Sequence, residues 1–180
     1  MRTVVTVFGS SRPTEGGAEY AAAFELGKEL GLRGYDLCNG GYGGTMEASA
    51  RGARESHAAA IGVTCDYFSR KPNRWIDKEV RVPTFADRLL KLVELGDAYA
   101  ILPGGTGTLL ELASVWEFTN KGLLRKKPVV IVGKFWQRVA ETMAEELRSE
   151  GLDDMAGLVH QEESPAAAAA YLHRRLLSGL

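Results

Sequence analysis

The sequence AILPGGTGTLLEL, residues 100–112, places an apolar run, a turn with three glycines and a glutamate within thirteen positions. Glycine has no Cβ and readily adopts positive φ, so a glycine-rich turn lets another group approach the main chain closely. The apolar run is typical of a buried strand and the residues after the turn favour a helix, so this stretch predicts a strand–turn–helix unit. Glu111 follows Thr108 by three positions, which predicts that its carboxylate returns to the helix face below the turn.

The same alternation of short apolar runs and longer amphipathic segments continues along the chain. It predicts strands at 3–8, 35–38, 59–65, 97–102, 128–132 and 157–160, and helices at 18–32, 45–55, 83–95, 108–120, 135–150 and from Pro165 onward, with Ser164 as N-cap. Residues 66–80 (DYFSRKPNRWIDKEV) have no clear periodicity, and we expect a loop or a partly helical lid there. Strands that are apolar throughout are typical of a parallel sheet covered on both faces. The pattern therefore predicts an α/β fold: a Rossmann-like, doubly wound parallel sheet in a three-layer α/β/α sandwich.

The composition is that of an ordinary globular protein. The chain has 180 residues, of which 45% are hydrophobic and 25% charged, and we expect residues 1–180 to form a single nucleotide-binding domain. A net charge of −1 favours neither nucleic acid nor an anionic membrane as a partner. Long apolar segments and leader-like patterns are absent from the sequence, so a cytoplasmic location is expected. Cys38 and Cys65 lack C-x-x-C spacing and are expected to be buried thiols.

Glycine-rich turns follow three of the predicted strands: GSSRPTEGG (9–17), NGGYGGTME (39–47) and PGGTGT (103–108). The carboxyl ends of parallel strands meet at one edge of a sheet, where ligands bind. Backbone amides of such turns, together with the helix N-terminus behind each, attract an anion. The three turns therefore predict a phosphate or carboxylate site, although each alone is also explained by the geometry of a tight turn.

Several familiar motifs are absent. Met46 and Leu110 occupy the place of the third glycine in the two candidate G-x-G-x-x-G sequences, and no G-x-x-x-x-G-K-[ST] or G-x-S-x-G is present. The sequence thus excludes a P-loop NTPase and lacks the dinucleotide fingerprint and the hydrolase nucleophile elbow.

The stretch PGGTGTLLE (103–111) resembles the P-G-G-x-G-T-x-x-E motif of the LOG (Lonely Guy) family, whose members are often labelled lysine decarboxylases. The resemblance extends over VFGSS (7–11), residues 25–53, IGV (61–63) and residues 87–105. It implies hydrolysis of the N-glycosidic bond of a nucleoside 5′-monophosphate, either AMP or a cytokinin riboside monophosphate, to the free base and ribose 5-phosphate. It also implies a homodimer or a higher homo-oligomer, an AMP-like ligand, and a reaction without a metal or cofactor.

The resemblance assigns roles to individual residues. Arg88 and Glu111 match the catalytic arginine and glutamate. Arg88 would steady the leaving group or orient Glu111, and Glu111 would stabilise an oxocarbenium-like ribose or activate water. The residues that match phosphate- or nucleotide-binding positions are Gly104, Gly105, Thr106, Gly107, Thr108, Gly9, Ser10, Gly40, Gly41, Gly44 and Met46.

The sequence also departs from the family pattern. Leu89 stands where a lysine usually follows the arginine, Asn39 replaces the first glycine of the second turn, and Tyr42 occupies a position usually held by serine. A non-hydrolytic nucleotide or molybdenum-cofactor (pterin phosphate) carrier is therefore an alternative. Without the resemblance, Glu111 is equally a helix-entry carboxylate favoured by the helix dipole, and Arg88 a solvated residue on a charged helix. Trp75, Trp116 and Trp136 are candidates either for stacking on a purine or for the core.

Overall fold

The computed structural model describes residues 2–179 and contains one seven-stranded sheet, in which the strands pair in parallel in the order β4-β3-β2-β1-β5-β6-β7. The strands are β1 Val4–Phe8, β2 Asp36–Asn39, β3 Ala60–Cys65, β4 Lys78–Val82, β5 Ala98–Ile101, β6 Val129–Val132 and β7 Val159–Glu162. The helices are α1 Ala18–Leu32, α2 Thr45–Glu55, α3 Phe85–Leu95, α4 Thr106–Asn120, α5 Gln137–Ser149, α6 Asp153–Ala156 and α7 Pro165–Leu177. The predicted doubly wound α/β fold is confirmed.

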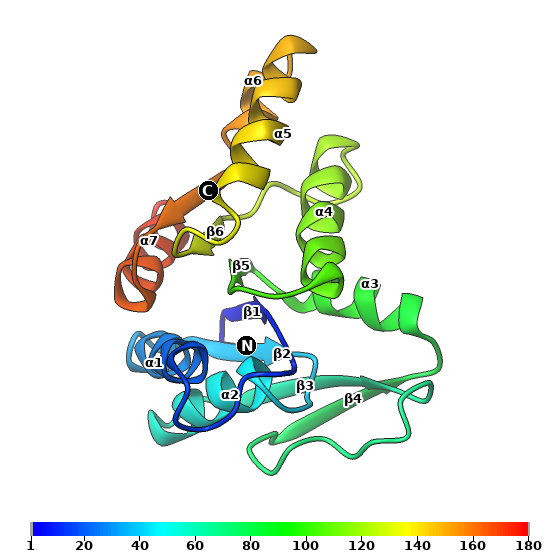
Figure 1. Ribbon diagram of the computed structural model, residues 1–180, viewed down its shortest axis with the longest axis vertical. Helices are drawn as coiled ribbons and strands as arrows, with labels where there is room; N and C mark the ends of the chain where they lie inside the picture. The colour runs from blue at the N-terminus through cyan, green and yellow to red at the C-terminus, as the bar shows by residue number, and fades with distance from the viewer. Residues whose placement is uncertain (1, 180) are drawn as a thin grey trace.

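Helices cover the two faces of the sheet. Buried residues of α1, α2 and α7 pack against one face, and buried residues of α3, α4, α5 and α6 against the other. Figure 1 shows α1 and α7 on one side of the sheet and α3 and α4 on the other. In β1, Val5 and Val7 face the first layer, whereas Val4 and Phe8 face the second. Because side chains alternate along a strand, an apolar residue at each of these positions lets the strand serve two cores at once.

The prediction for residues 66–80 was partly wrong, because β4 begins at Lys78 within this segment. The strand reads KEVRV, with three exposed charged residues, and it forms the outer edge of the sheet beside β3. An edge strand is covered incompletely and tolerates charges that discourage further strand pairing. The apolar pattern used to find buried strands is therefore missing here. Residues 66–77 connect β3 to this edge strand.

Helix α3 begins later than predicted, at Phe85 rather than Pro83. Its N-cap is Thr84, whose hydroxyl accepts a hydrogen bond from the Asp87 amide at 3.1 Å, while the Asp87 carboxylate accepts one from the Thr84 amide at 3.2 Å. This reciprocal capping box fixes the start of the helix, so that Arg88 lies in its first turn. By contrast, α1 and α2 have the predicted bounds, and Ser164 caps α7 as expected. Both cysteines are buried free thiols, as predicted.

Candidate active site

The three glycine-rich turns lie together at the carboxyl edge of the sheet and are hydrogen-bonded to one another. The Ser10 amide donates to the Pro103 carbonyl at 3.3 Å, which joins the turn after β1 to the turn after β5. The Thr45 amide, at the start of α2, donates to the Ser10 carbonyl at 2.8 Å, and the Thr45 hydroxyl donates to the same oxygen at 3.0 Å. The convergence expected from the parallel topology is therefore present.

A cavity of about 340 Å³ opens between these turns, α3, α4 and the segment 66–77. Its lining includes Gly9, Ser10, Met46, Arg88, Gly105, Thr106, Gly107, Thr108 and Glu111 from the sequence-derived set. Gly40, Gly41, Gly44 and Gly104 are not among the lining residues. The site thus brings together both catalytic candidates and most of the PGGTGT turn.

The N-terminus of α4 faces this cavity without a side-chain cap. The first hydrogen bond of the helix runs from the Leu109 amide to the Gly105 carbonyl at 3.1 Å, so the amides of Thr106, Gly107 and Thr108 precede the helical bonding pattern. A Cβ built on Gly105 or Gly107 would meet no atom within 4 Å. Within residues 2–179 these amides have no hydrogen-bond acceptor, and amides beside open space at the positive end of a fifteen-residue helix are suited to hold an anion.

Gly9, Gly44 and Gly104 each leave room for a neighbouring group of the protein. A Cβ on Gly9 would lie 2.4 Å from the Thr45 hydroxyl oxygen, and one on Gly44 would lie 2.3 Å from the Ser10 carbonyl oxygen. Gly44 also has φ +72°, which disfavours other residues. These two glycines allow the first turn and the start of α2 to touch. Gly104 similarly makes room for the Thr108 side chain.

Arg88 is buried, with 7% of its surface exposed, and its side chain is held by main-chain carbonyls. Nε donates to the Val63 carbonyl at 2.8 Å and Nη2 to the Gly40 carbonyl at 3.1 Å. A Cβ on Gly40 would lie 1.7 Å from Nη2, so Gly40 is needed to admit the guanidinium. Nη1 makes no hydrogen bond within residues 2–179 and remains available to a ligand. The solvated-residue interpretation of Arg88 is therefore wrong.

Glu111 lines the same cavity from α4 and is partly buried. Its carboxylate forms no hydrogen bond or ion pair with any residue that the structure describes. Burial raises the pKa of Glu111 to about 7, while the nearby Arg88 opposes that rise. A carboxyl group that is near half-ionised at neutral pH, and free of protein partners, is suited to accept a proton from water.

Arg88 and Glu111 are not bonded to each other in the described part of the chain. The expectation that Arg88 orients Glu111 through a charge-assisted hydrogen bond is therefore not met in this structure, because Val63 and Gly40 already occupy two of the guanidinium nitrogens. Arg88 acts on Glu111 only through its charge, which favours the ionised carboxylate.

Sequence reasoning missed six lining residues: Ser11, Arg12, Tyr42, Phe68, Arg70 and Phe85. None of the tryptophans considered for stacking lines the cavity. Trp116 donates from Nε1 to the Met155 carbonyl at 2.8 Å, and Trp136 donates to the Leu102 carbonyl at 2.9 Å, so both belong to the core. The aromatic side chains of the site come from the second turn, the segment 66–77 and the start of α3.

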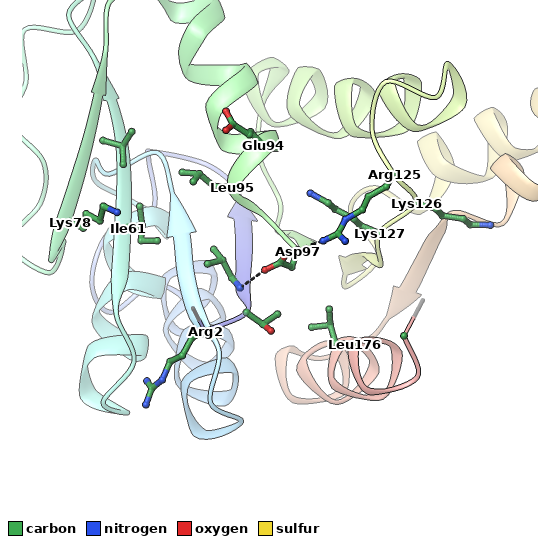
Figure 2. Close-up of a pocket in the computed structure, with 14 residues that line it drawn as sticks. Arg2, Ile61, Lys78, Glu94, Leu95, Asp97, Arg125, Lys126, Lys127 and Leu176 are labelled. Atoms are coloured by element: carbon green, nitrogen blue, oxygen red, sulfur yellow. Dashed lines mark hydrogen bonds and ion pairs between the residues drawn. The ribbon is translucent and has the colours of Figure 1, made fainter.

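A larger cavity, of about 680 Å³, lies at the opposite edge of the sheet (Figure 2). It contains none of the predicted site residues. Asp97 there accepts hydrogen bonds from the Val4 amide at 3.0 Å and from Arg125 at 3.2 Å. Figure 2 shows Arg2 and Lys126 extending toward opposite sides. None of the three glycine-rich turns lines this cavity.

Within residues 2–179, no three His, Cys, Asp or Glu side chains are grouped closely enough to hold a metal ion. None of the helices formed by these residues has the length and apolar character needed to cross a membrane.

Comparison with known proteins agrees with this architecture. A solved structure of the molybdenum cofactor carrier protein of Chlamydomonas reinhardtii superposes with a TM-score of 0.78 over 98% of this chain and 99% of that one, at 24% identity. A likeness at this identity shows a shared fold. The chain is thus an α/β protein of this architecture, in which the uncapped N-terminus of α4 lies at the carboxyl edge of the sheet.

The family follows from sequence comparison. The family model described as "Possible lysine decarboxylase" matches residues 46–172, so the chain belongs to this family, the LOG family. The cytokinin riboside 5′-monophosphate phosphoribohydrolase of Mycobacterium tuberculosis is 30% identical over 131 residues, which cover 71% of this chain and 69% of that one. The pyrimidine/purine nucleotide 5′-monophosphate nucleosidase of Escherichia coli is 34% identical over 103 residues, but the match spans only 23% of its length and 52% of this chain.

Proposed function

We propose that the protein hydrolyses the N-glycosidic bond of a nucleoside 5′-monophosphate such as AMP, releasing the free base and ribose 5-phosphate. One observation carries the proposal: Glu111, which has no hydrogen bond or ion pair to the described residues and has its pKa raised to about 7, lines the same cavity as the uncapped N-terminus of α4. The names of the relatives from Mycobacterium tuberculosis and Escherichia coli support the same class of reaction.

In this proposal the phosphate binds the amides of Thr106, Gly107 and Thr108. Binding a remote phosphate fixes the ribose relative to the catalytic groups, and the binding energy is used for positioning. Gly105 and Gly107 leave the space that the phosphate needs, because neither position has a neighbour that a Cβ would touch. The hydroxyl groups of the two threonines add further donors.

The chemical step needs charge stabilisation and a proton acceptor. As the C1′–N bond breaks, the base leaves with the bonding electron pair and takes up a proton, while water adds to C1′ and loses one. The ribose passes through an oxocarbenium-like state, which the carboxylate of Glu111 stabilises while it accepts the proton from water. Arg88 has Nη1 available to bond the base or the ribose.

The alternative is a carrier that binds a nucleotide or the molybdenum cofactor without hydrolysis. The shared fold with the carrier protein of Chlamydomonas reinhardtii and the presence of Arg12, Arg70 and Arg88 around the cavity favour an anionic ligand in either case. A carrier has no need of an unpaired carboxylate beside the phosphate, where it repels the anion. Glu111 is therefore the residue that separates the two proposals.

We also propose a homodimer. An apolar groove of about 390 Å³ between α4 and α5 is lined by Leu109, Leu112, Ala113, Trp116, Val139, Met143 and Leu147 among others. Leu109, Leu110 and Met143 are exposed at 37–44%. Exposed apolar patches of this kind mark interaction sites. Sedimentation velocity should give a species of twice 19.5 kDa, and a monomer at all concentrations would refute the dimer.

Incubating the purified protein with AMP and separating the products by chromatography tests the main proposal. We expect adenine and ribose 5-phosphate in equal amounts. AMP that binds tightly but is recovered intact would instead favour the carrier.

A further inference from the structure

Three aromatic side chains that the motif analysis did not assign form a connected cluster at the cavity. The Phe68 ring makes edge-to-face contacts with Tyr42, at 5.6 Å between centroids, and with Phe85, at 6.0 Å. All three residues line the cavity, and Phe85 is 40% exposed. We call Tyr42, Phe68 and Phe85 the aromatic wall.

The aromatic wall surrounds the guanidinium of Arg88. The Cζ atom of Arg88 lies 5.5 Å from the centroid of Tyr42 and 5.9 Å from that of Phe68, both within the range of a cation–π interaction. Because Arg88 is fixed by two carbonyl groups, the wall is fixed relative to the catalytic candidates as well. Phe68 is the central member, since it touches both other rings and the arginine.

Phe68 belongs to the segment 66–77, which Asn73 fastens to the second glycine-rich turn. The Asn73 side-chain amide donates to the Tyr42 carbonyl at 2.8 Å and to the Gly41 carbonyl at 3.2 Å, and its backbone amide donates to Gly41 at 2.8 Å. The Asn73 side-chain oxygen accepts from the Trp75 amide at 2.9 Å. The segment is thus held in place, and both the nitrogen and the oxygen of the Asn73 side-chain amide are hydrogen-bonded to the main chain.

The wall therefore presents mainly carbon to the cavity. Phe68 and Phe85 have no polar side-chain atoms, and the Tyr42 hydroxyl already accepts a hydrogen bond from the Cys65 amide at 3.3 Å. A flat ring offers its π face to any base, whereas reading the base edge requires free donors and acceptors. Arg70, which lines the cavity two positions after Phe68, is the polar side chain of the segment that such a readout would use.

We propose that Phe68 is a base-binding residue: with Phe85 and Tyr42 it forms a stacking surface for the base of the ligand, so that the site accepts purine and pyrimidine nucleotides alike. This inference rests on the proposed function, because it takes a nucleoside 5′-monophosphate as the ligand. The phosphate binds at the start of α4, the ribose lies near Glu111, and the base reaches the aromatic wall.

Calorimetric titration with AMP, UMP and ribose 5-phosphate tests this inference, with Glu111→Gln as the background so that the ligands are not consumed. We expect AMP and UMP to bind within about tenfold of each other. Phe68→Ala should weaken both by about 5- to 150-fold, the usual range for losing one base–aromatic stack, and leave ribose 5-phosphate within twofold. Tyr67→Ala is the matched control. The Tyr67 ring packs edge-to-face against Phe68, with 5.4 Å between the ring centroids, but Tyr67 is 76% exposed and does not line the cavity.

Three outcomes overturn the inference: unchanged nucleotide affinity in Phe68→Ala, an equal loss for ribose 5-phosphate, or no binding of either nucleotide. A preference of more than 100-fold for one base that disappears in Arg70→Ala also overturns it, because this shows hydrogen-bond readout. Nucleotide binding that depends on Phe68, together with no base release by the wild type, refutes the proposed hydrolysis and leaves the stacking surface standing. Hydrolysis of AMP, together with nucleotide binding that does not depend on Phe68, supports the proposed hydrolysis and overturns the stacking surface.

Discussion

Arg88 and Glu111 line one cavity from two neighbouring helices, and no hydrogen bond or ion pair joins them in the described part of the chain. Arg88 is fixed by the carbonyls of Val63 and Gly40, so its charge is held in place without neutralising the carboxylate. Glu111 is left with burial as the main influence on its pKa, which rises to about 7. Such an arrangement leaves both groups available to a ligand.

The activity should rise with pH through about 7. In the proposed reaction Glu111 works as a carboxylate, and the pKa of about 7 means that it is protonated in most molecules at pH 6 and ionised in most at pH 8. The dependence of kcat/KM on pH reports this group in the free enzyme. A profile that stays flat between pH 5 and 9 would show that Glu111 does not titrate in the catalytic step.

Glu111→Gln should stabilise the fold at alkaline pH. The pKa of Glu111 is higher in the folded chain than the ordinary value of 4.5, so ionisation costs stability as the pH rises from about 4.5 to about 7. A difference of one pKa unit between the folded and unfolded chain corresponds to about 1.36 kcal/mol. Ionisation of Glu111 therefore lowers the free energy of unfolding by up to about 3 kcal/mol above pH 8, and this loss is absent well below pH 4.5. Urea unfolding should therefore show a larger gain for Glu111→Gln at pH 8 than at pH 5. An equal gain at both pH values would contradict the raised pKa.

Arg88→Ala should destabilise the fold as well as abolish activity. The substitution leaves the buried carbonyls of Val63 and Gly40 without this donor, which costs about 1–3 kcal/mol for each unsatisfied group. The free energy of unfolding in urea measures the loss. Arg138→Ala, at an exposed position on α5, is the control and should change stability by less than about 0.5 kcal/mol. Equal stability of the two variants would refute the structural part of this assignment.

Two glycines of the PGGTGT turn should respond oppositely to alanine. Gly107→Ala adds a methyl group in open space within a helix and should maintain or raise stability by up to about 1 kcal/mol, while the methyl group obstructs AMP at the α4 amides. Gly104→Ala places a Cβ 2.2 Å from the Thr108 hydroxyl oxygen and should cost about 1–3 kcal/mol. Thermal unfolding combined with AMP titration separates the two effects. Loss of stability in Gly107→Ala would indicate that this glycine serves packing.

Most of the fold could be predicted from the sequence, because β1, β3, β5 and β6 are apolar on both faces and the helices between them are amphipathic. It did not reveal β4, whose charges at the sheet edge resemble those of a loop. It located the glycine-rich turns but did not separate Gly105 and Gly107, which face open space, from Gly104, which packs against a side chain.

The aromatic wall was equally hidden from sequence reasoning. Its members come from three segments that are distant along the chain, and only the path of residues 66–77 across the second turn brings Phe68 to Arg88. No periodicity or motif records such a contact. Tyr42 was visible in the sequence only as a departure from a family pattern.

The most direct test of the central claim compares Glu111→Gln with Glu25→Gln, an exposed glutamate on α1, in adenine release from AMP and in AMP affinity. The account predicts that Glu111→Gln lowers kcat by about 10²- to 10⁴-fold, the usual contribution of a general base, and still binds AMP, while Glu25→Gln matches the wild type. Wild-type rates in Glu111→Gln, or a wild-type protein that binds AMP and never releases adenine, would contradict it.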